Sequence, residues 1–140
     1  AVFAELPGQD LFIASAAVAD YRPANFAPQK IKKGEGPVAL ELVRTPDILA
    51  EVAAQSPRPF VVGFAAETHE VERYARGKLE RKRLDMIAAN RVGADGCAFE
   101  AEDNALSVYW ADGGEEIPRA GKRLVAERLL QLALKRMEAR

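Results

Sequence analysis

The chain has 140 residues, 49% of them hydrophobic, which suits one domain with a sizeable core. Its 20 Lys and Arg nearly balance its 21 Asp and Glu, so a formal net charge of -1 gives no overall attraction to nucleic acid. Cys97 and His69 are the only residues of their types, which excludes a disulfide framework and a Cys/His zinc site. No stretch approaches the ~20 apolar residues of a membrane span and no signal peptide opens the chain, so we expect a cytoplasmic protein without membrane contact.

The beginning of the chain has the pattern of a helix end. Residues 1–6 look like the last turns of a helix that Pro7-Gly8 stops, without an initiator Met or an N-cap signal. We expect residues 1–140 to form a single domain and to be a piece of a longer chain. A short N-terminal helix is the alternative.

The first predicted strand ends in tiny side chains. Residues 11–17 are an apolar run typical of a buried strand, and Asp20 follows it closely. Small residues at a strand's carboxyl end let a ligand lie against the main chain, at the edge where open α/β sheets bind ligands. Asp20 could accept a hydrogen bond from a ribose hydroxyl or help to hold magnesium, or it could simply cap the turn.

A lysine cluster follows this strand. Lys30, Lys32 and Lys33 precede Gly34-Glu35-Gly36, which makes a flexible, cationic segment suited to a polyanion such as a triphosphate. Solvated loop charges are the alternative. Lysine repulsion and two glycines predict that residues 30–37 are the most mobile internal segment and close over a bound ligand.

The middle of the chain alternates strands and helices. We predict a half-exposed strand over 37–43, followed by a helix from Thr45-Pro46 to about residue 55. A buried strand over 60–65 comes next, and then a helix that is capped by Thr68 and runs to about residue 83. An apolar strand over 85–89 completes this part of the chain. This order predicts parallel pairing in a doubly wound, Rossmann-like, mostly parallel α/β sheet.

The last third changes character. Residues 105–111 and 116–118 flank the turn signal Asp112-Gly113-Gly114 and predict a hairpin. A final helix over about 121–139 should pack on the core through a wide apolar stripe, made of Val125, Leu129, Leu130, Leu132, Leu134 and Met137.

Two lysines on the predicted helix 68–83 suggest a phosphate site. Lys78 has no acidic residue three or four positions away on that helix, and Lys82 repeats its charge one turn on. A solvated basic face is the alternative. Phe64, near the end of the strand before this helix, could be a core residue or a nucleotide contact. Residues 46–49 offer a helix N-terminus, which binds anions, although Pro46 has no N–H and Asp47 repels phosphate.

These motifs together resemble phosphopantothenoylcysteine synthetase, in bacteria usually the C-terminal half of a bifunctional coenzyme A enzyme. Residues 15–23, 30–33, 45–49, 62–68 and 85–90 carry the resemblance in order, and it covers the whole chain. It implies CTP binding, with Lys30 also important for catalysis, through these residues: Ala14, Ser15, Ala16, Ala17, Asp20, Lys30, Pro46, Asp47, Ile48, Leu49, Phe64, Lys78 and Lys82.

The reaction implied by this resemblance joins 4'-phosphopantothenate to L-cysteine with CTP and magnesium, through an acyl-cytidylate. The resemblance also implies a homodimer and, in the full-length chain, an FMN-dependent decarboxylase domain. The family's N-terminal half, with its glycine-rich turn and an asparagine that stabilises the acyl-cytidylate, has no counterpart here. We therefore expect this part of the synthetase to be inactive alone.

Two alternatives from other classes remain at this point. A nicotinamide-dependent oxidoreductase shares the architecture, but no strand here is followed by Gly-x-Gly-x-x-Gly. A non-catalytic nucleotide-binding or interaction module is the other. Residue types alone do not decide between CTP and ATP.

Overall fold

The computed structural model describes residues 1–33, 36–91 and 102–140. They form two compact units, residues 1–15 with 48–140 and residues 16–47, each of which is described by itself. The assignment of residues 1–140 to a single domain stays a prediction. Cys97, Gly34 and Glu35 lie outside the described residues.

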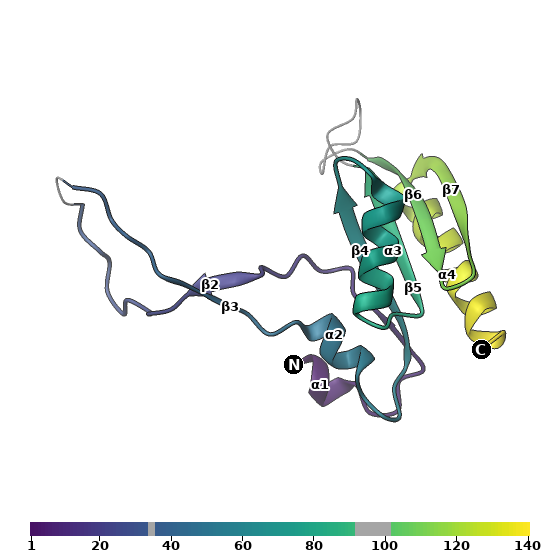
Figure 1. The fold of residues 1–140 in the computed structure, drawn as a ribbon, viewed down its shortest axis with the longest axis horizontal. Coiled ribbons are helices and arrows are strands. Elements are labelled where there is room, and N and C mark those ends of the chain that lie inside the picture. The colour runs from purple at the N-terminus through teal and green to yellow at the C-terminus, as the bar shows by residue number, and fades with distance from the viewer. Residues whose placement is uncertain (34–35, 92–101) are drawn as a thin grey trace. The chain divides into compact units, whose positions relative to one another are not determined.

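The larger unit is built on a five-stranded mixed sheet in the order β1-β4-β5-β6-β7 (Figure 1). Its strands are β1 (Leu11–Ile13), β4 (Phe60–Glu67), β5 (Met86–Arg91), β6 (Asp103–Trp110) and β7 (Gly113–Gly121). β1, β4 and β5 are parallel, whereas β6 and β7 form the predicted antiparallel hairpin. The predicted α/β class with a C-terminal hairpin and helix is confirmed, with two of the sheet's four pairings parallel.

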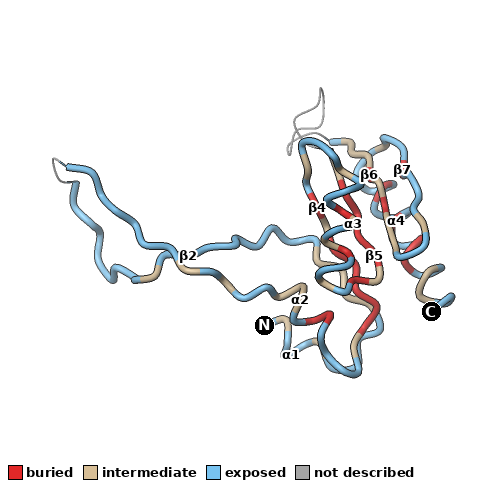
Figure 2. Tube along the Cα trace, viewed as in Figure 1, coloured by how far each residue is buried: buried red, intermediate tan, exposed pale blue. Residues whose placement is uncertain are grey.

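Helices cover both faces of this sheet, as a doubly wound fold requires. α1 (Val2–Glu5), α2 (Ile48–Ala53) and α3 (Val71–Arg81) contribute to the core cluster on one face, and α4 (Lys122–Glu138) to the cluster on the other. The buried residues concentrate in β4, β5 and the helices against them (Figure 2). In the described part of the chain, no helix is long and apolar enough to cross a membrane.

Asp85 joins the amino-terminal ends of β4 and β5. Its carboxylate accepts the Val61 backbone N–H at 2.8 Å and forms a bidentate ion pair with Arg58, at 2.5 and 3.0 Å. Only 12% of the Asp85 side chain and 20% of the Arg58 side chain are exposed. Such a bidentate pair fixes geometry as well as charge, so it holds the start of β5 beside Val61 and Val62 of β4.

Two arginines, one on α3 and one on α4, contact aromatic rings on opposite faces of β6. The guanidinium of Arg76, on α3, lies 4.8 Å from the ring centroid of Tyr109, and that of Arg136, on α4, lies 4.7 Å from the ring centroid of Trp110. Consecutive strand residues point to opposite faces. Each helix therefore gains a cation–π contact with its own face of the same strand.

The hairpin ends the sheet at β7. Arg119 on β7 donates to Asp103 on β6 at 2.9 Å, and this hydrogen bond and charge hold the pKa of the Asp103 carboxyl below its usual range. Pro118 lies within β7, an edge strand. Proline is confined to edge strands because it has no N–H to donate.

The smaller unit is an exposed two-stranded hairpin. β2 (Tyr21–Pro23) pairs antiparallel with β3 (Leu42–Arg44), and residues 24–33 and 36–41 connect them without further described strands. The prediction of a strand over 37–43 was largely wrong, because β3 begins only at Leu42. β2 was not predicted, since its three residues are all exposed and show no buried face.

Several predicted ends were also wrong. β1 stops at Ile13 and is only half-buried, because it lies at an edge of the sheet. α2 begins at Ile48, so Thr45 is not its N-cap; the Thr45 hydroxyl donates instead to the Ala19 carbonyl. α3 begins at Val71 with Glu70 as N-cap, and the Thr68 hydroxyl lies 2.9 Å from the His69 ring instead.

The apolar stripe of α4 is narrower than predicted. Val125, Leu129 and Leu132 are buried as expected, and Met137 packs against them. Leu130 and Leu134, in contrast, are 43% and 41% exposed. They project from a different side of the helix, and the leucine pattern alone did not show which side faces the sheet.

Gly63 allows α2 to pack closely against β4. A Cβ built at Gly63 would lie 2.7 Å from Leu84 Cδ1 and 3.1 Å from Leu49 Cδ2, inside the core. We expect Gly63→Ala to lower the free energy of unfolding by about 1–3 kcal/mol, the usual cost of overpacking. Urea denaturation measures this.

The control is Gly77→Ala, on the exposed face of α3, where an added Cβ meets nothing within 4 Å. Alanine there should raise the free energy of unfolding by about 0.5–1 kcal/mol through helix propensity. Equal effects of the two substitutions would contradict the packing role of Gly63.

Candidate nucleotide site at the carboxyl ends of the parallel strands

The larger unit holds seven of the predicted nucleotide contacts. They are Ala14, Ser15, Ile48, Leu49, Phe64, Lys78 and Lys82. The smaller unit holds the other six, which are Ala16, Ala17, Asp20, Lys30, Pro46 and Asp47. Each group is described within its own unit.

The end of β1 brings Ala14 beside the middle of β4, which runs past Phe64 to Glu67 and so ends two residues later than predicted. Ile13 pairs with Val62, and the Ala14 N–H donates to the Val62 carbonyl at 2.9 Å. Ala14 therefore lies beside the stretch of β4 that leads to Phe64, and Ser15, which follows, is exposed. Phe64 is half-buried and packs against the core cluster on the α4 face, so its ring is a core contact first.

Ile48 and Leu49 form the first turn of α2, and their side chains pack into the opposite core cluster. Both side chains are only partly buried there. The predicted anion site at this helix start loses its basis, because Thr45-Pro46 does not open the helix and α2 has only six residues.

Lys78 has an acidic partner that helix spacing did not reveal. Its Nζ lies 2.6 Å from Glu67 Oε1, at the carboxyl end of β4. Helix spacing shows no acidic neighbour of Lys78, and its partner comes from β4 instead. Glu67 is the residue at this edge that sequence reasoning missed, because the pair joins two elements.

Lys82 is the C-cap residue of α3, and its N–H donates to the Lys78 carbonyl at 3.0 Å. The Cα atoms of Lys78 and Lys82 are one turn apart, about 6 Å along the helix axis. Because α3 leads from the end of β4 back to the start of β5, Lys82 starts farther from the carboxyl edge than Lys78 does.

The base of the smaller unit brings Asp20 close to residues 45–47. The Thr45 N–H donates to the Asp20 carbonyl at 3.0 Å, and Tyr21 pairs with Arg44. Asp20 and Asp47 thus flank the same end of the hairpin, with Ala16 and Ala17 leading into it. Lys30 lies on the connecting segment, where it is exposed like Lys32 and Lys33.

Among the described residues, no three His, Cys, Asp or Glu side chains cluster as a metal site would require. Magnesium used with a nucleotide is bound mainly by phosphates and waters plus one or two carboxylates. Asp20 or Asp47 has the right chemistry to supply one of those carboxylates.

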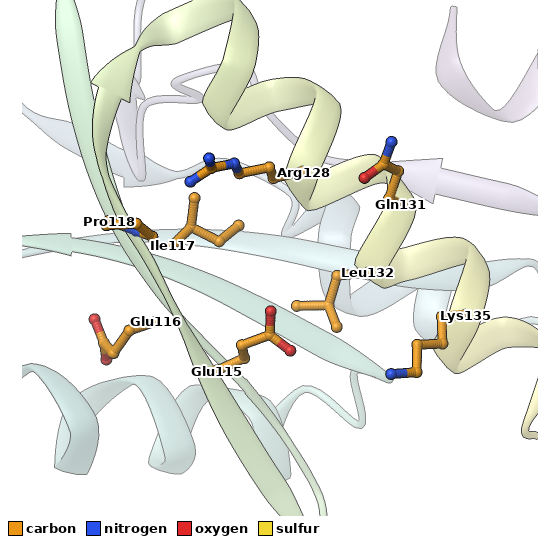
Figure 3. Close-up of a pocket in the computed structure, with 8 residues that line it drawn as sticks. All are labelled: Glu115, Glu116, Ile117, Pro118, Arg128, Gln131, Leu132 and Lys135. Atoms are coloured by element: carbon orange, nitrogen blue, oxygen red, sulfur yellow. The ribbon is translucent and has the colours of Figure 1, made fainter.

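Two hollows of the larger unit lie elsewhere. One, of about 370 Å³, lies between β7 and α4 and is lined by Glu115, Glu116, Ile117, Pro118, Arg128, Gln131, Leu132 and Lys135 (Figure 3). The other, of about 570 Å³, is lined by residues of α1 and of the loops that precede β1 and β4. Neither contains a predicted nucleotide contact.

Comparison with known proteins decides the family. Residues 1–137 match the family described as "DFP: DNA/pantothenate metabolism flavoprotein C-terminal domain". The chain belongs to this family. The synthetase resemblance seen in the motifs is confirmed at this level.

Two bacterial proteins are similar to the chain over nearly its whole length. It is 49% identical over 140 residues to the coenzyme A biosynthesis bifunctional protein CoaBC of Vibrio cholerae, covering 98% of this chain and 35% of that protein. It is 48% identical over 134 residues to CoaBC of Escherichia coli, covering 93% and 33%. The chain thus spans about a third of the length of these relatives.

Solved structures show the same fold. The crystal structure of the C-terminal domain of a CoaBC protein matches this chain with a TM-score of 0.69 and 33% identity. The match covers 96% of this chain and 58% of the chain in that structure. A DNA/pantothenate metabolism flavoprotein from Streptococcus pneumoniae matches with a TM-score of 0.70, and the match covers 94% of this chain and 66% of that chain. At 18% identity this similarity supports the fold alone.

The Lys78–Glu67 pair changes what we expect of lysine substitutions. Lys78→Ala should weaken nucleotide binding and also lower the free energy of unfolding by about 1 kcal/mol, because it leaves the Glu67 carboxylate without its cation. Lys82→Ala should weaken nucleotide binding too. Urea denaturation and calorimetric titration with CTP separate the two effects.

The stability control is Glu72→Ala, which breaks the exposed Glu72–Arg76 pair on the same helix. Exposed helix pairs contribute about 0.3–0.5 kcal/mol. A Lys78→Ala protein that is as stable as the native chain would show that Glu67 does not depend on Lys78.

Proposed function

We propose that this chain is the CTP-contacting part of a phosphopantothenate–cysteine ligase in coenzyme A biosynthesis. The observation that carries the proposal is 49% identity to CoaBC along 98% of the chain. Residues 14–20, 30–33, 46–49, 64 and 78–82 give the same picture from their chemistry, with small residues, lysines and carboxylates in the order of the synthetase motifs. Catalysis would require the rest of the ligase domain, because the chain spans about a third of its relatives.

The proposed reaction has two steps. The carboxylate oxygen of 4'-phosphopantothenate attacks the α-phosphorus of CTP, the bond to the β-phosphate oxygen breaks, and diphosphate leaves. The cysteine amine then attacks the acyl carbon of the acyl-cytidylate, loses a proton and displaces CMP. No side chain of the protein needs to be the nucleophile.

The lysines would supply the electrostatic part of catalysis. Negative charge grows on the diphosphate as it leaves, and cations placed in advance lower that barrier. Lys30, Lys78 and Lys82 suit this role, because each is a compact charge on a flexible stem. Magnesium bound to the phosphates would add Lewis-acid stabilisation, with Asp20 or Asp47 as a carboxylate ligand.

We also propose a homodimer, formed through the smaller unit. Val18, Tyr21, Phe26, Ile31, Val38, Leu40 and Leu42 of this unit are between 51% and 89% exposed. Apolar side chains gathered on one small unit typically mark an interaction surface. The other expected associations are with an FMN-dependent decarboxylase domain of the same polypeptide and with the cytoplasmic pools of CTP and cysteine.

The chain should bind CTP with magnesium more tightly than NADPH. Its lysines suit a triphosphate, and the sequence contains no Gly-x-Gly-x-x-Gly to hold a dinucleotide. Isothermal titration calorimetry with CTP, ATP and NADPH measures this, and the ATP titration shows base preference. Equal or tighter binding of NADPH would favour the oxidoreductase alternative.

Lys30 should matter for turnover more than for CTP affinity, since its charge would act on the reacting phosphates. The test replaces the matching third of the Escherichia coli relative with this chain and measures diphosphate release with CTP, phosphopantothenate and cysteine. Lys30→Gln should reduce kcat by about 100-fold or more, the scale of losing one transition-state donor.

Lys33→Gln in the same chimera is the matched control, and a much smaller loss of kcat is expected. A Lys30→Gln chimera with near-normal turnover would remove Lys30 from the catalytic residues. A native chimera that binds CTP but releases no diphosphate would support the non-catalytic module instead.

A further inference from the structure

The Glu67–Lys78 pair differs from the other ion pairs of α3. Glu72–Arg76 and Glu70–Arg73 join residues of the helix or its cap, and each has an acidic side chain that is 62% or 48% exposed. Glu67 belongs to β4 instead, its side chain is only 16% exposed, and the Lys78 side chain is 35% exposed. This pair therefore links the flexible Lys78 side chain to β4, a central strand of the sheet.

The direction of the lysine stem follows from helix geometry. Side chains on a helix point back toward its N-terminus, and the N-terminus of α3 follows the carboxyl end of β4. Strand alternation places Glu67 on the same face of β4 as Ala65, which packs in the core cluster that includes α3. The 2.6 Å contact thus holds the ammonium of Lys78 at the carboxyl edge of the sheet.

We propose that Glu67 is a positioning residue that holds the Lys78 ammonium ready for the phosphates of the bound nucleotide; this rests on the proposed function above. An ammonium group has three N–H donors. Glu67 accepts one and leaves two for phosphate oxygens. Without Glu67, Arg81 and Lys82, three and four residues further on, would repel Lys78 while nothing described on its own helix would hold it.

A purely repulsive role makes the opposite prediction. A carboxylate beside a nucleotide repels its phosphates, so a Glu67 that did not position Lys78 would weaken binding. The sign of the change in CTP affinity on removing Glu67 therefore separates the two roles.

The test is calorimetric titration of CTP with magnesium into the native chain and into Glu67→Ala, Glu67→Gln, Lys78→Ala and the Glu67→Ala/Lys78→Ala double variant. Glu67→Ala should weaken binding by about three- to tenfold, within the range of coupling between contacting residues. Glu67→Gln keeps an acceptor for the ammonium and should recover part of the loss. In the Lys78→Ala background, Glu67→Ala should cost nothing further.

Glu72→Ala is the matched control, because it removes a glutamate and an ion pair from the exposed part of the same helix, and its CTP affinity should equal that of the native chain. Should Glu67→Ala fail to fold, Glu67→Gln, with nearly the same shape, must still bind CTP more weakly than the native chain.

Native or tighter binding by both Glu67 variants would overturn the positioning role while leaving the proposed function intact. The positioning role would also be overturned if Glu67→Ala reduced CTP affinity equally in the native chain and in the Lys78→Ala variant, since Glu67 would then act through another group. A native chain that binds no CTP would overturn the proposed function and this inference together.

Discussion

The Asp85 carboxylate fixes the alignment of β5 with β4, and the candidate site depends on that alignment. Asp85 accepts the Val61 N–H and pairs with Arg58 through both of its oxygens, so β5 begins beside Val62, two residues into β4. Their register then runs without a break from Val62–Met86 to Glu67–Arg91. The position of Glu67 at the carboxyl end of β4, beside Arg91 of β5, follows from this alignment.

Positions with strong local signals were predicted well from the sequence. β4 and β5 are apolar runs between breakers, the hairpin has the turn signal Asp112-Gly113-Gly114, and α4 is a long helix with an apolar face. Each feature is encoded by residues that are neighbours along the chain. The sequence motifs also led to the correct family, because they occur in the right order across the chain.

Features that depend on distant partners could not be predicted in this way. The Thr45 hydroxyl bonds to the Ala19 carbonyl, 26 positions earlier, although its position before Pro46 is typical of a helix cap. Lys78 bonds to Glu67 on another element, where helix spacing alone shows no partner. Leu130 and Leu134 have helical spacing, but the fold decides which side of α4 the sheet covers. Local sequence patterns show which side chains can form hydrogen bonds or ion pairs, but the fold decides which partner each side chain has.

The two edges of the sheet differ in their capacity to pair with a further strand. Pro118 interrupts the row of N–H groups on β7, and Glu115, Glu116 and Arg119 add charge to that strand. Both are devices that discourage edge-to-edge pairing in natural sheets. β1 carries neither proline nor charge in Leu11-Phe12-Ile13. Pairing with a further strand is therefore discouraged at the hairpin edge, and the residues of β1 carry no such feature.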